Sequence, residues 1–312
     1  MHFFSFFNKY TSVFIFSFGI MFFQLFSCSN NSSKVFRETP TDGTINISVD
    51  ESFKPVIDSE IKVFESSFPN AKIIVHYKSE ADCFRDLAKD STRMIIVTRG
   101  LNKNEENFYK DSIHFIPIYG LLAYDAIAVI LNNKSKDTIL SMKDVQSLLN
   151  GTTANKQIVM DGASATSTVR FAIDSVLKGQ KLGKDVVAAK SSEGVIDYVA
   201  DHENAIGFIG VSWICDQDDP QQLKFLQRVK IAAVQCTSCL GETRVQPYQA
   251  NIALRRYPMV RGLYYILKED FAGVGNNFVN FLQFERGQLI FSRAYLWPAK
   301  MSFEIRDSKI SN

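Results

Sequence analysis

Two short polar stretches of the sequence place hydroxyl groups and a basic side chain where a helix is expected to begin. VDESFKP at 49–55 supplies Ser52 and Lys54 beside a proline, and TSTVR at 166–170 supplies three hydroxyls and Arg170. The first turn of a helix has unpaired N–H groups and the positive end of the helix dipole, so each stretch could hold an oxyanion. If the two stretches face each other, they form the two halves of an anion site in a cleft.

The second helix carries its basic residue in the first turn, where the dipole favours carboxylates instead. Apolar residues recur at helical spacing after the polar stretch: Val169, Ala172, Ile173, Val176 and Leu177. This spacing places the helix start at Thr166 or Ser167. Arg170 is therefore expected to face a negative charge. The ordinary alternative is a pair of simple N-caps, with Arg170 paired to Asp161 or Asp174 and Lys54 paired to the acid four residues later.

Length and composition favour a two-lobed α/β protein. The chain has 312 residues, 46% of them hydrophobic, and chains longer than about 250 residues usually divide into two units. Strand-like and helix-like stretches alternate, as a mainly parallel sheet requires. The formal net charge is +2 and no block of like charges occurs, so we expect no nucleic-acid partner and only a local preference for anions.

The apolar pattern predicts the order of these elements. Strands are expected at 45–49, 71–77, 94–97, 120–132, 157–160 and 205–210. Helices are expected at 53–68, 83–88, 141–150, 167–177 and 191–202, with two more between 276 and 295. Residues 216–247 are expected to be a polar, loop-rich stretch, and residues 251–268 to be strand-like at both ends.

The N-terminal residues have the pattern of an export signal. Lys9 is the only Lys or Arg in residues 1–27, and a Phe-rich apolar run extends over 10–26. The alternative is an uncleaved membrane anchor, because this run approaches the ~20 apolar residues that span a bilayer.

The end of the apolar run favours a lipoprotein. LFSC at 25–28 resembles the lipobox of bacterial lipoproteins, in which the cysteine is lipidated, and the polar stretch SNNSSK follows it. We therefore expect residues 1–27 to be a lipoprotein signal peptide and Cys28 to carry the lipid. Residues 28–42 would then tether the protein to a membrane, in the periplasm or at the cell surface.

The other four cysteines are expected in an oxidising compartment, where disulfides persist. Cys236 and Cys239 form a CTSC motif, for which a structural disulfide is the favoured interpretation. A zinc site needs four ligands and no histidine lies nearby in the sequence, so we expect no metal and no cofactor. A thiol oxidoreductase is the alternative, although the motif lies in a loop-rich segment. Cys83 and Cys215 are either buried thiols or a second bridge.

The order of several longer stretches resembles the PstS-type phosphate-binding proteins of bacterial ABC transporters, especially lipoprotein members from the Bacteroidetes. The resemblance covers nearly all of the mature chain. The stretches that carry it are ISVDESFKPVIDSEIKVFE (47–65), IIVTRGLNKNEE (95–106), YDAIAVILN (124–132), SMKDVQSLLNG (141–151), TSTVRF (166–171), AIGFIG (205–210), YPMVRGLYYI (257–266) and RGQLIFSRAYLWPA (286–299).

The resemblance implies a two-lobed class II periplasmic-binding-protein fold, with a mainly parallel sheet flanked by helices in each lobe. The first lobe would hold residues 43–122 and 256–308, and the second would hold residues 123–255. The ligand, inorganic phosphate or a related oxyanion, would bind in the cleft between them. The protein would be a monomer without enzymatic activity that delivers phosphate to an ABC permease for import.

The resemblance also assigns ligand-binding residues to this chain. They are Ser52 at the first helix start, Ser79 and Glu80 after the second strand, Thr98 and Arg99 at the Ser-Arg position, and Thr166, Ser167 and Thr168 at the Ser-Gly-Thr turn, with Arg170 beside it. One carboxylate in the site would select phosphate, because monohydrogen phosphate can donate a proton and sulfate cannot. Glu51, Glu80 and Asp161 are the candidates.

The chain departs from the family at the Ser-Gly-Thr turn. The pattern fits SAT at 164–166 or TST at 166–168, and neither contains the glycine. We prefer 166–168, because it lies at the helix start. The arginine that many members carry before the turn is missing, so Arg170 or Arg99 would replace its charge.

These departures leave rival functions open. One is a binder of another oxyanion or of a small anionic metabolite. Another is a non-transport surface or sensory protein with the same fold, and a third is the thiol oxidoreductase described above.

Replacement of Cys28 by serine tests the predicted lipid anchor. The Cys28→Ser protein should leave the membrane fraction, because the hydroxyl cannot take the thioether-linked lipid. Fractionation followed by a high-salt wash measures this. Retention of the variant in washed membranes would show instead that the apolar run at 10–26 is a spanning anchor.

Overall fold

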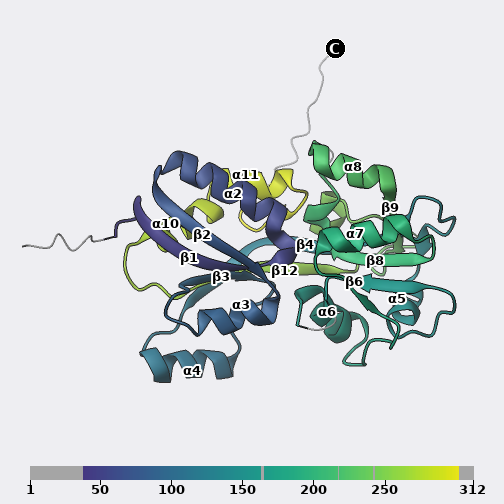
Figure 1. Ribbon diagram of the computed structural model, residues 1–312, viewed down its shortest axis with the longest axis horizontal. Helices are drawn as coiled ribbons and strands as arrows, with labels where there is room; N and C mark the ends of the chain where they lie inside the picture. Colours follow the sequence, from purple (N-terminus) through teal and green to yellow (C-terminus); the bar gives the residue numbers. More distant parts are fainter. Residues whose placement is uncertain (1–37, 163–164, 217, 242, 302–312) are drawn as a thin grey trace, which may run out of the picture. The chain divides into compact units, whose positions relative to one another are not determined.

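The computed structural model describes residues 38–162, 165–216, 218–241 and 243–301 (Figure 1). The predicted signal peptide, Cys28, most of the predicted tether and the predicted end of the first lobe at 302–308 lie outside the described residues. Among the residues described, no helix has the length and apolar character needed to cross a membrane.

The sheets contain β1 (Asp42–Asp50), β2 (Asn70–Lys78), β3 (Met94–Val97), β4 (Ile118–Asn132), β5 (Ile139–Leu140), β6 (Gln157–Met160), β7 (Val187–Ala188), β8 (Ala205–Gly210), β9 (Val229–Ile231), β10 (Ala233–Gln235), β11 (Arg244–Val245), β12 (Val260–Leu267) and β13 (Trp297–Pro298). The α-helices are α2 (Lys54–Ser67), α3 (Glu80–Leu87), α4 (Lys103–Ile113), α5 (Met142–Leu149), α6 (Ser167–Phe171), α7 (Ser192–Asp201), α8 (Pro220–Arg228), α9 (Gln249–Ala253), α10 (Val274–Gln283) and α11 (Glu285–Arg293). Short turns of other helix types are η2 (Glu51–Phe53), η3 (Ala172–Val176) and η4 (Val211–Trp213).

One sheet connects two groups of parallel strands, with the order β2-β1-β3-β12-β4-β8-β6-β7. The first lobe is built on β1, β2 and β3, and the second on β6, β7 and β8 (Figure 1). The long strand β4 belongs to both, since it pairs with β12 over 118–126 and with β8 over 127–131. Strands β1, β2, β3 and β6 all end at the same region, and the carboxyl ends of parallel strands are where ligands bind in such sheets.

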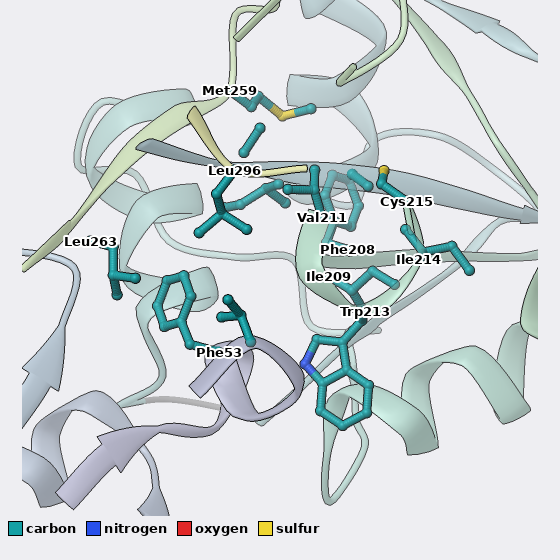
Figure 2. Close-up of a cluster of buried hydrophobic side chains, with 14 of the residues drawn as sticks. Phe53, Phe208, Ile209, Val211, Trp213, Ile214, Cys215, Met259, Leu263 and Leu296 are labelled. Carbon is teal, nitrogen blue, oxygen red and sulfur yellow. The ribbon is translucent and has the colours of Figure 1, made fainter. Parts of the chain in front are cut away.

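The core packs against both faces of these strands. In the first lobe, β1 buries alternate apolar side chains against α2, whose Phe64 makes an edge contact with Phe278 of α10. Where the lobes meet, Phe53, Phe208 and Trp213 lie in the same apolar cluster, together with Leu296 (Figure 2). Phe53 follows Ser52 directly, so this packing fixes the position of the first polar stretch.

Most predicted elements are confirmed, and the strands at 94–97, 157–160 and 205–210 match residue for residue. The expected loop at 216–247 was wrong in part, because it contains the capped amphipathic helix α8 and three short strands. The prediction of a strand at the start of 251–268 was also wrong, since Gln249–Ala253 is helical and only Val260–Leu267 is a strand. Both errors arose from short segments whose apolar residues are too few to define a period.

The helix of the second polar stretch is not regular. It begins at Ser167 with Thr166 as its N-cap, as expected. After five residues it continues as the π-helical turn Ala172–Val176, in which the Leu177 N–H bonds the Ala172 carbonyl. Such turns insert one residue into a helix and occur often near functional sites.

The structure joins Cys236 and Cys239 in a disulfide, with Cα atoms 5.5 Å apart. Cys83 and Cys215 are free and buried. Burial raises the pKa of the Cys215 thiol to about 12, so this thiol is protonated and unreactive at neutral pH.

Removal of the disulfide should lower stability without changing ligand affinity. A disulfide that closes so short a loop stabilises the folded protein by about 2 kcal/mol. The Cys236→Ser/Cys239→Ser protein should therefore melt roughly 4–8 °C lower. Differential scanning calorimetry and ligand titration test the two parts. A loss of affinity in the folded variant would connect this loop to the binding site.

Candidate ligand-binding site

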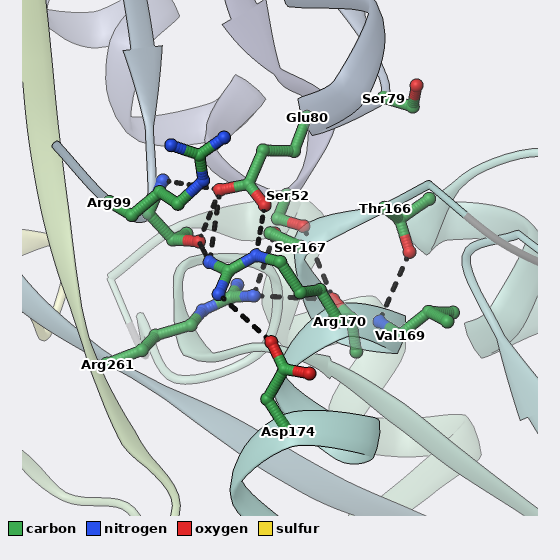
Figure 3. A network of polar contacts seen from close by, with 12 residues as sticks. Ser52, Ser79, Glu80, Arg99, Thr166, Ser167, Val169, Arg170, Asp174 and Arg261 are labelled. Carbon is green, nitrogen blue, oxygen red and sulfur yellow. Dashed lines mark hydrogen bonds and ion pairs between the residues drawn. The ribbon is translucent and has the colours of Figure 1, made fainter. Parts of the chain in front are cut away.

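The carboxyl ends of β1, β3 and β6 bring the predicted site residues together. Ser52 follows β1, Thr98 follows β3, and the turn at 165–168 follows β6. Hydrogen bonds join these stretches across the boundary between the lobes, including Ser52 to Asp161 and Arg170 to Thr98. Figure 3 shows Arg170 facing Glu80. The two polar stretches therefore face each other.

Asp161 is the centre of the hydroxyl cluster. Its Oδ1 accepts a hydrogen bond from Thr166 at 3.0 Å, and its Oδ2 accepts from Thr168 at 3.0 Å and from Ser52 at 3.2 Å. Burial raises the pKa of Asp161, although Arg261 and the three hydroxyls lower it in part. Three hydroxyl donors from two lobes thus converge on one pair of carboxylate oxygens.

Arg261 supplies the buried positive charge of the site. Its side chain is 3% exposed, its Nε bonds Asp125 at 2.7 Å, and its Nη1 donates to Ser167 at 2.9 Å. The guanidinium lies 5.1 Å from the ring centre of Phe53. Its Nη2 is buried and makes no hydrogen bond to any described residue.

Sequence reasoning missed Arg261 and Asp125. Each is a charged residue inside an apolar strand, and the two are direct partners in the register of β12 and β4. A buried charge in a strand is rare unless it is paired, so the two charges together were a usable signal. Arg261 is a third arginine next to the turn at 165–168, in addition to Arg170 and Arg99.

Arg170 faces a carboxylate of the other lobe. Its Nε bonds Glu80 at 2.6 Å, and its Nη2 donates to Thr98 at 2.6 Å (Figure 3). The alternative partner Asp174 is exposed and 3.7 Å away. Burial raises the pKa of Glu80, but the hydrogen bonds and charge of Arg170 outweigh it and hold this pKa below its usual value.

Two more acids lie at the first helix start. Glu51 accepts hydrogen bonds from the backbone N–H and the hydroxyl of Ser192, at the start of α7. Burial raises the pKa of Glu51 to about 7. Asp50 accepts the Ser52 N–H at 2.9 Å, and burial raises its pKa to about 6 although Arg261 opposes the shift.

The remaining predicted residues lie at the edge of this cluster. Ser79 caps α3 and bonds Asp82, which leaves it on a cavity wall. Arg99 forms a two-point ion pair with Glu105 and stacks on Phe84, so it points away from the hydroxyls. Lys54 pairs with the acid four residues later, as the ordinary alternative supposed.

Ala165 has a backbone φ of 72°, in the region that favours glycine. This geometry favours the alignment of the Ser-Gly-Thr pattern at 164–166 over the one that we preferred. The Ala165 carbonyl accepts the Ala81 N–H of α3, so the strained residue also joins the two lobes.

Two cavities flank Ala165. One, of about 330 Å³, is lined by Asp50, Glu51, Tyr77, Lys78, Ser79, Asp82, Asp161, Gly162, Ala165, Thr166, Ala189 and Lys190. The other, of about 300 Å³, lies beside Glu80, Arg99 and Arg170 and has an apolar floor. No group of His, Cys, Asp or Glu side chains in the described part of the chain is arranged to hold a metal ion.

Comparison with protein families finds one match over most of the chain. A family model described as a PBP superfamily domain matches residues 35–285. No curated protein is similar enough in sequence to count as a relative.

Solved structures show the same fold at low sequence identity. A Clostridium perfringens protein described as a phosphate ABC transporter substrate-binding protein, with bound phosphate, is 19% identical with a TM-score of 0.68, over 83% of this chain and 100% of its own. An ABC-type phosphate transport receptor from Vibrio cholerae is 16% identical with a TM-score of 0.60, and the match covers 82% of this chain and 100% of the receptor chain. The OxyR2 regulatory domain from Vibrio vulnificus is 9% identical with a TM-score of 0.50, and the match covers 79% of this chain and 95% of that domain. The predicted two-lobed class II fold is confirmed.

Replacement of Arg261 should be severely destabilising. Arg261→Gln removes the partner of a fully buried acid, which typically costs about 3–5 kcal/mol, and urea unfolding measures this. Lys54→Gln is the control: it breaks an exposed ion pair and should lower the free energy of unfolding by less than ~1 kcal/mol. Adding Asp125→Asn to Arg261→Gln should recover part of the loss. A cost below ~1 kcal/mol for Arg261→Gln would mean that the guanidinium is not what balances the buried acids.

Proposed function

This chain belongs to the PBP superfamily, and we propose that it is an extracytoplasmic solute-binding protein that captures inorganic phosphate between its lobes. It is not an enzyme, and it passes the anion to an ABC permease. A lipid on Cys28 anchors it to the membrane, and it acts as a monomer. The lobes comprise residues 43–122 with 256–308, and residues 123–255.

The convergence of donors at the lobe boundary carries this proposal. Ser52, Thr166 and Thr168 direct three hydroxyls at the oxygens of Asp161. A carboxylate and an oxyanion both present negatively charged acceptor oxygens, so a site that satisfies one can satisfy the other. Arg261 adds a buried guanidinium beside them, since its Nη1 lies 3.5 Å from the Thr168 hydroxyl and its Nη2 has no hydrogen-bond partner among the described residues.

Bound phosphate would take donors from the internal carboxylates. Asp161 and Glu80 hold the hydroxyls and Arg170 in position, and an entering anion exchanges with them or binds beside them. Because lobe-to-lobe hydrogen bonds run through the same groups, binding is coupled to the relative movement of the lobes.

The buried acids favour a protonated oxyanion. Asp50 and Asp161 are acceptors at the site, and the pKa of each is raised by burial. Monohydrogen phosphate offers a proton to such an acceptor, whereas sulfate at neutral pH has none and would be repelled. The acid that selects phosphate is therefore Asp161 or Asp50, and Glu80 is committed to Arg170.

Calorimetry on unfolded, ligand-stripped and refolded protein tests the function. Phosphate should bind and sulfate should not. Arg170→Ala should weaken phosphate binding by about tenfold to a hundredfold, because it removes a charged donor and leaves Glu80 as an uncompensated acid in the cleft. Ser52→Ala should weaken it by less.

Asp174→Ala is the matched control, because this exposed acid touches Arg170 but not the hydroxyl cluster. It should leave phosphate affinity unchanged. Unaltered affinity in Arg170→Ala would remove that residue from the site. If only another oxyanion binds, the proposed ligand is wrong. If no oxyanion binds, a non-transport role for this fold is favoured.

A further inference from the structure

The 330 Å³ cavity beside the hydroxyl cluster has an excess of negative charge. Four of its lining side chains are acids, Asp50, Glu51, Asp82 and Asp161, and two are lysines. Lys78 is already paired with Asp86 at 2.6 Å, outside this cavity, and Lys190 is exposed. An anion without protons would therefore enter a cavity whose own charge repels it.

One acid in the wall has an unused acceptor. Asp50 is 1% exposed, and its Oδ2 is buried and accepts no hydrogen bond from any described residue. An unsatisfied buried carboxylate oxygen is costly, so a donor that a ligand brings to Asp50 would be stabilising. The nearby Ser167 hydroxyl lowers the pKa of Asp50 only in part, so the net shift stays upward.

Glu51 beside it lacks a positive partner. Its hydrogen bonds come from the neutral Ser192, and its pKa is raised by burial and by the charges of Asp161 and Asp50. Asp82 adds a third acid to the same wall and is 43% exposed at its side chain. Its ion pair is with Arg85, which does not line the cavity.

We propose that, besides inorganic phosphate, the site binds a phosphomonoester or phosphonate that carries a primary ammonium group on a short carbon chain. This inference rests on the proposed oxyanion site. The phosphoryl group binds the hydroxyls of Ser52, Thr166 and Thr168, and the ammonium group binds in the acidic cavity against Asp50, Glu51 and Asp82. Thr166 and Asp161 line both places, so one small molecule reaches from one to the other.

An ammonium group brings hydrogen-bond donors and a positive charge to the acids of this cavity. It brings three donors and one positive charge, whereas monohydrogen phosphate brings one donor and two negative charges. The ion pair with Glu51 and Asp50 would also favour their charged forms and draw their pKa values down. Binding of the ammonium ligand would therefore release protons near neutral pH.

The test compares three ligands by calorimetry at pH 7: phosphoethanolamine, ethyl phosphate and inorganic phosphate. Ethyl phosphate is the matched control, because it lacks only the ammonium group. Phosphoethanolamine should bind at least tenfold tighter than ethyl phosphate. Repetition in buffers of different ionisation enthalpy should show proton release for phosphoethanolamine and not for ethyl phosphate.

Two variants assign the preference to the cavity. Asp82→Asn and Glu51→Gln should each weaken phosphoethanolamine binding by about fivefold or more and strengthen phosphate binding, because each removes an ionisable acid from the cavity wall. Asp201→Asn, at the far end of α7, should change neither affinity.

The outcomes separate this inference from the proposed function. If inorganic phosphate binds and the two esters bind equally or not at all, the ammonium site is wrong and the oxyanion site stands. If none of the three binds, the proposed function fails as well. Equal losses for phosphoethanolamine and phosphate in Asp82→Asn would show a structural effect and overturn the assignment of the cavity.

Discussion

The burial of Arg261 in the middle of the sheet is the constraint on which the site depends. A guanidinium removed from water needs local negative charge, and Asp125 provides it from the adjacent strand. The two residues are register partners, so a one-residue slip between β12 and β4 would separate them. The same guanidinium holds Ser167 at the start of α6 and lies over Phe53, and in this way it fixes both polar stretches.

The lobes contact each other through carboxylates that accept donors from the opposite side. Ser52 of the first polar stretch donates to Asp161, while Arg170 and Ser192 of the second lobe donate to acids that follow β1 and β2. These donors are the ones that an oxyanion needs. Any anion that binds here must therefore alter the contacts between lobes, which links recognition to movement without a separate switch.

The sequence predicted most elements, because these depend on local patterns. It left the facing of the two polar stretches conditional, because that depends on how the strands are ordered in the sheet. The strand ends at Asp50 and Met160 follow from apolar runs, and the cap at Thr166 follows from helical spacing. The pairing of Arg261 with Asp125 is set by strand order and register, which no local pattern contains. The left-handed backbone of Ala165 could not be predicted either, since alanine carries none of the signal that glycine would.

The electrostatic balance of the site determines what a ligand has to contribute. Asp50, Glu80, Asp125 and Asp161 are all buried around two guanidiniums, one of which is partly exposed. Burying such acids costs stability, and the raised pKa values of Asp50 and Asp161 express that cost as a tendency to bind protons. The buried acids therefore lower the stability of the fold, and in exchange they place hydrogen-bond acceptors at the candidate binding site. A ligand that brings protons or a positive charge relieves the cost, and a fully ionised anion increases it, so selectivity arises from the protein's own unfavourable charge.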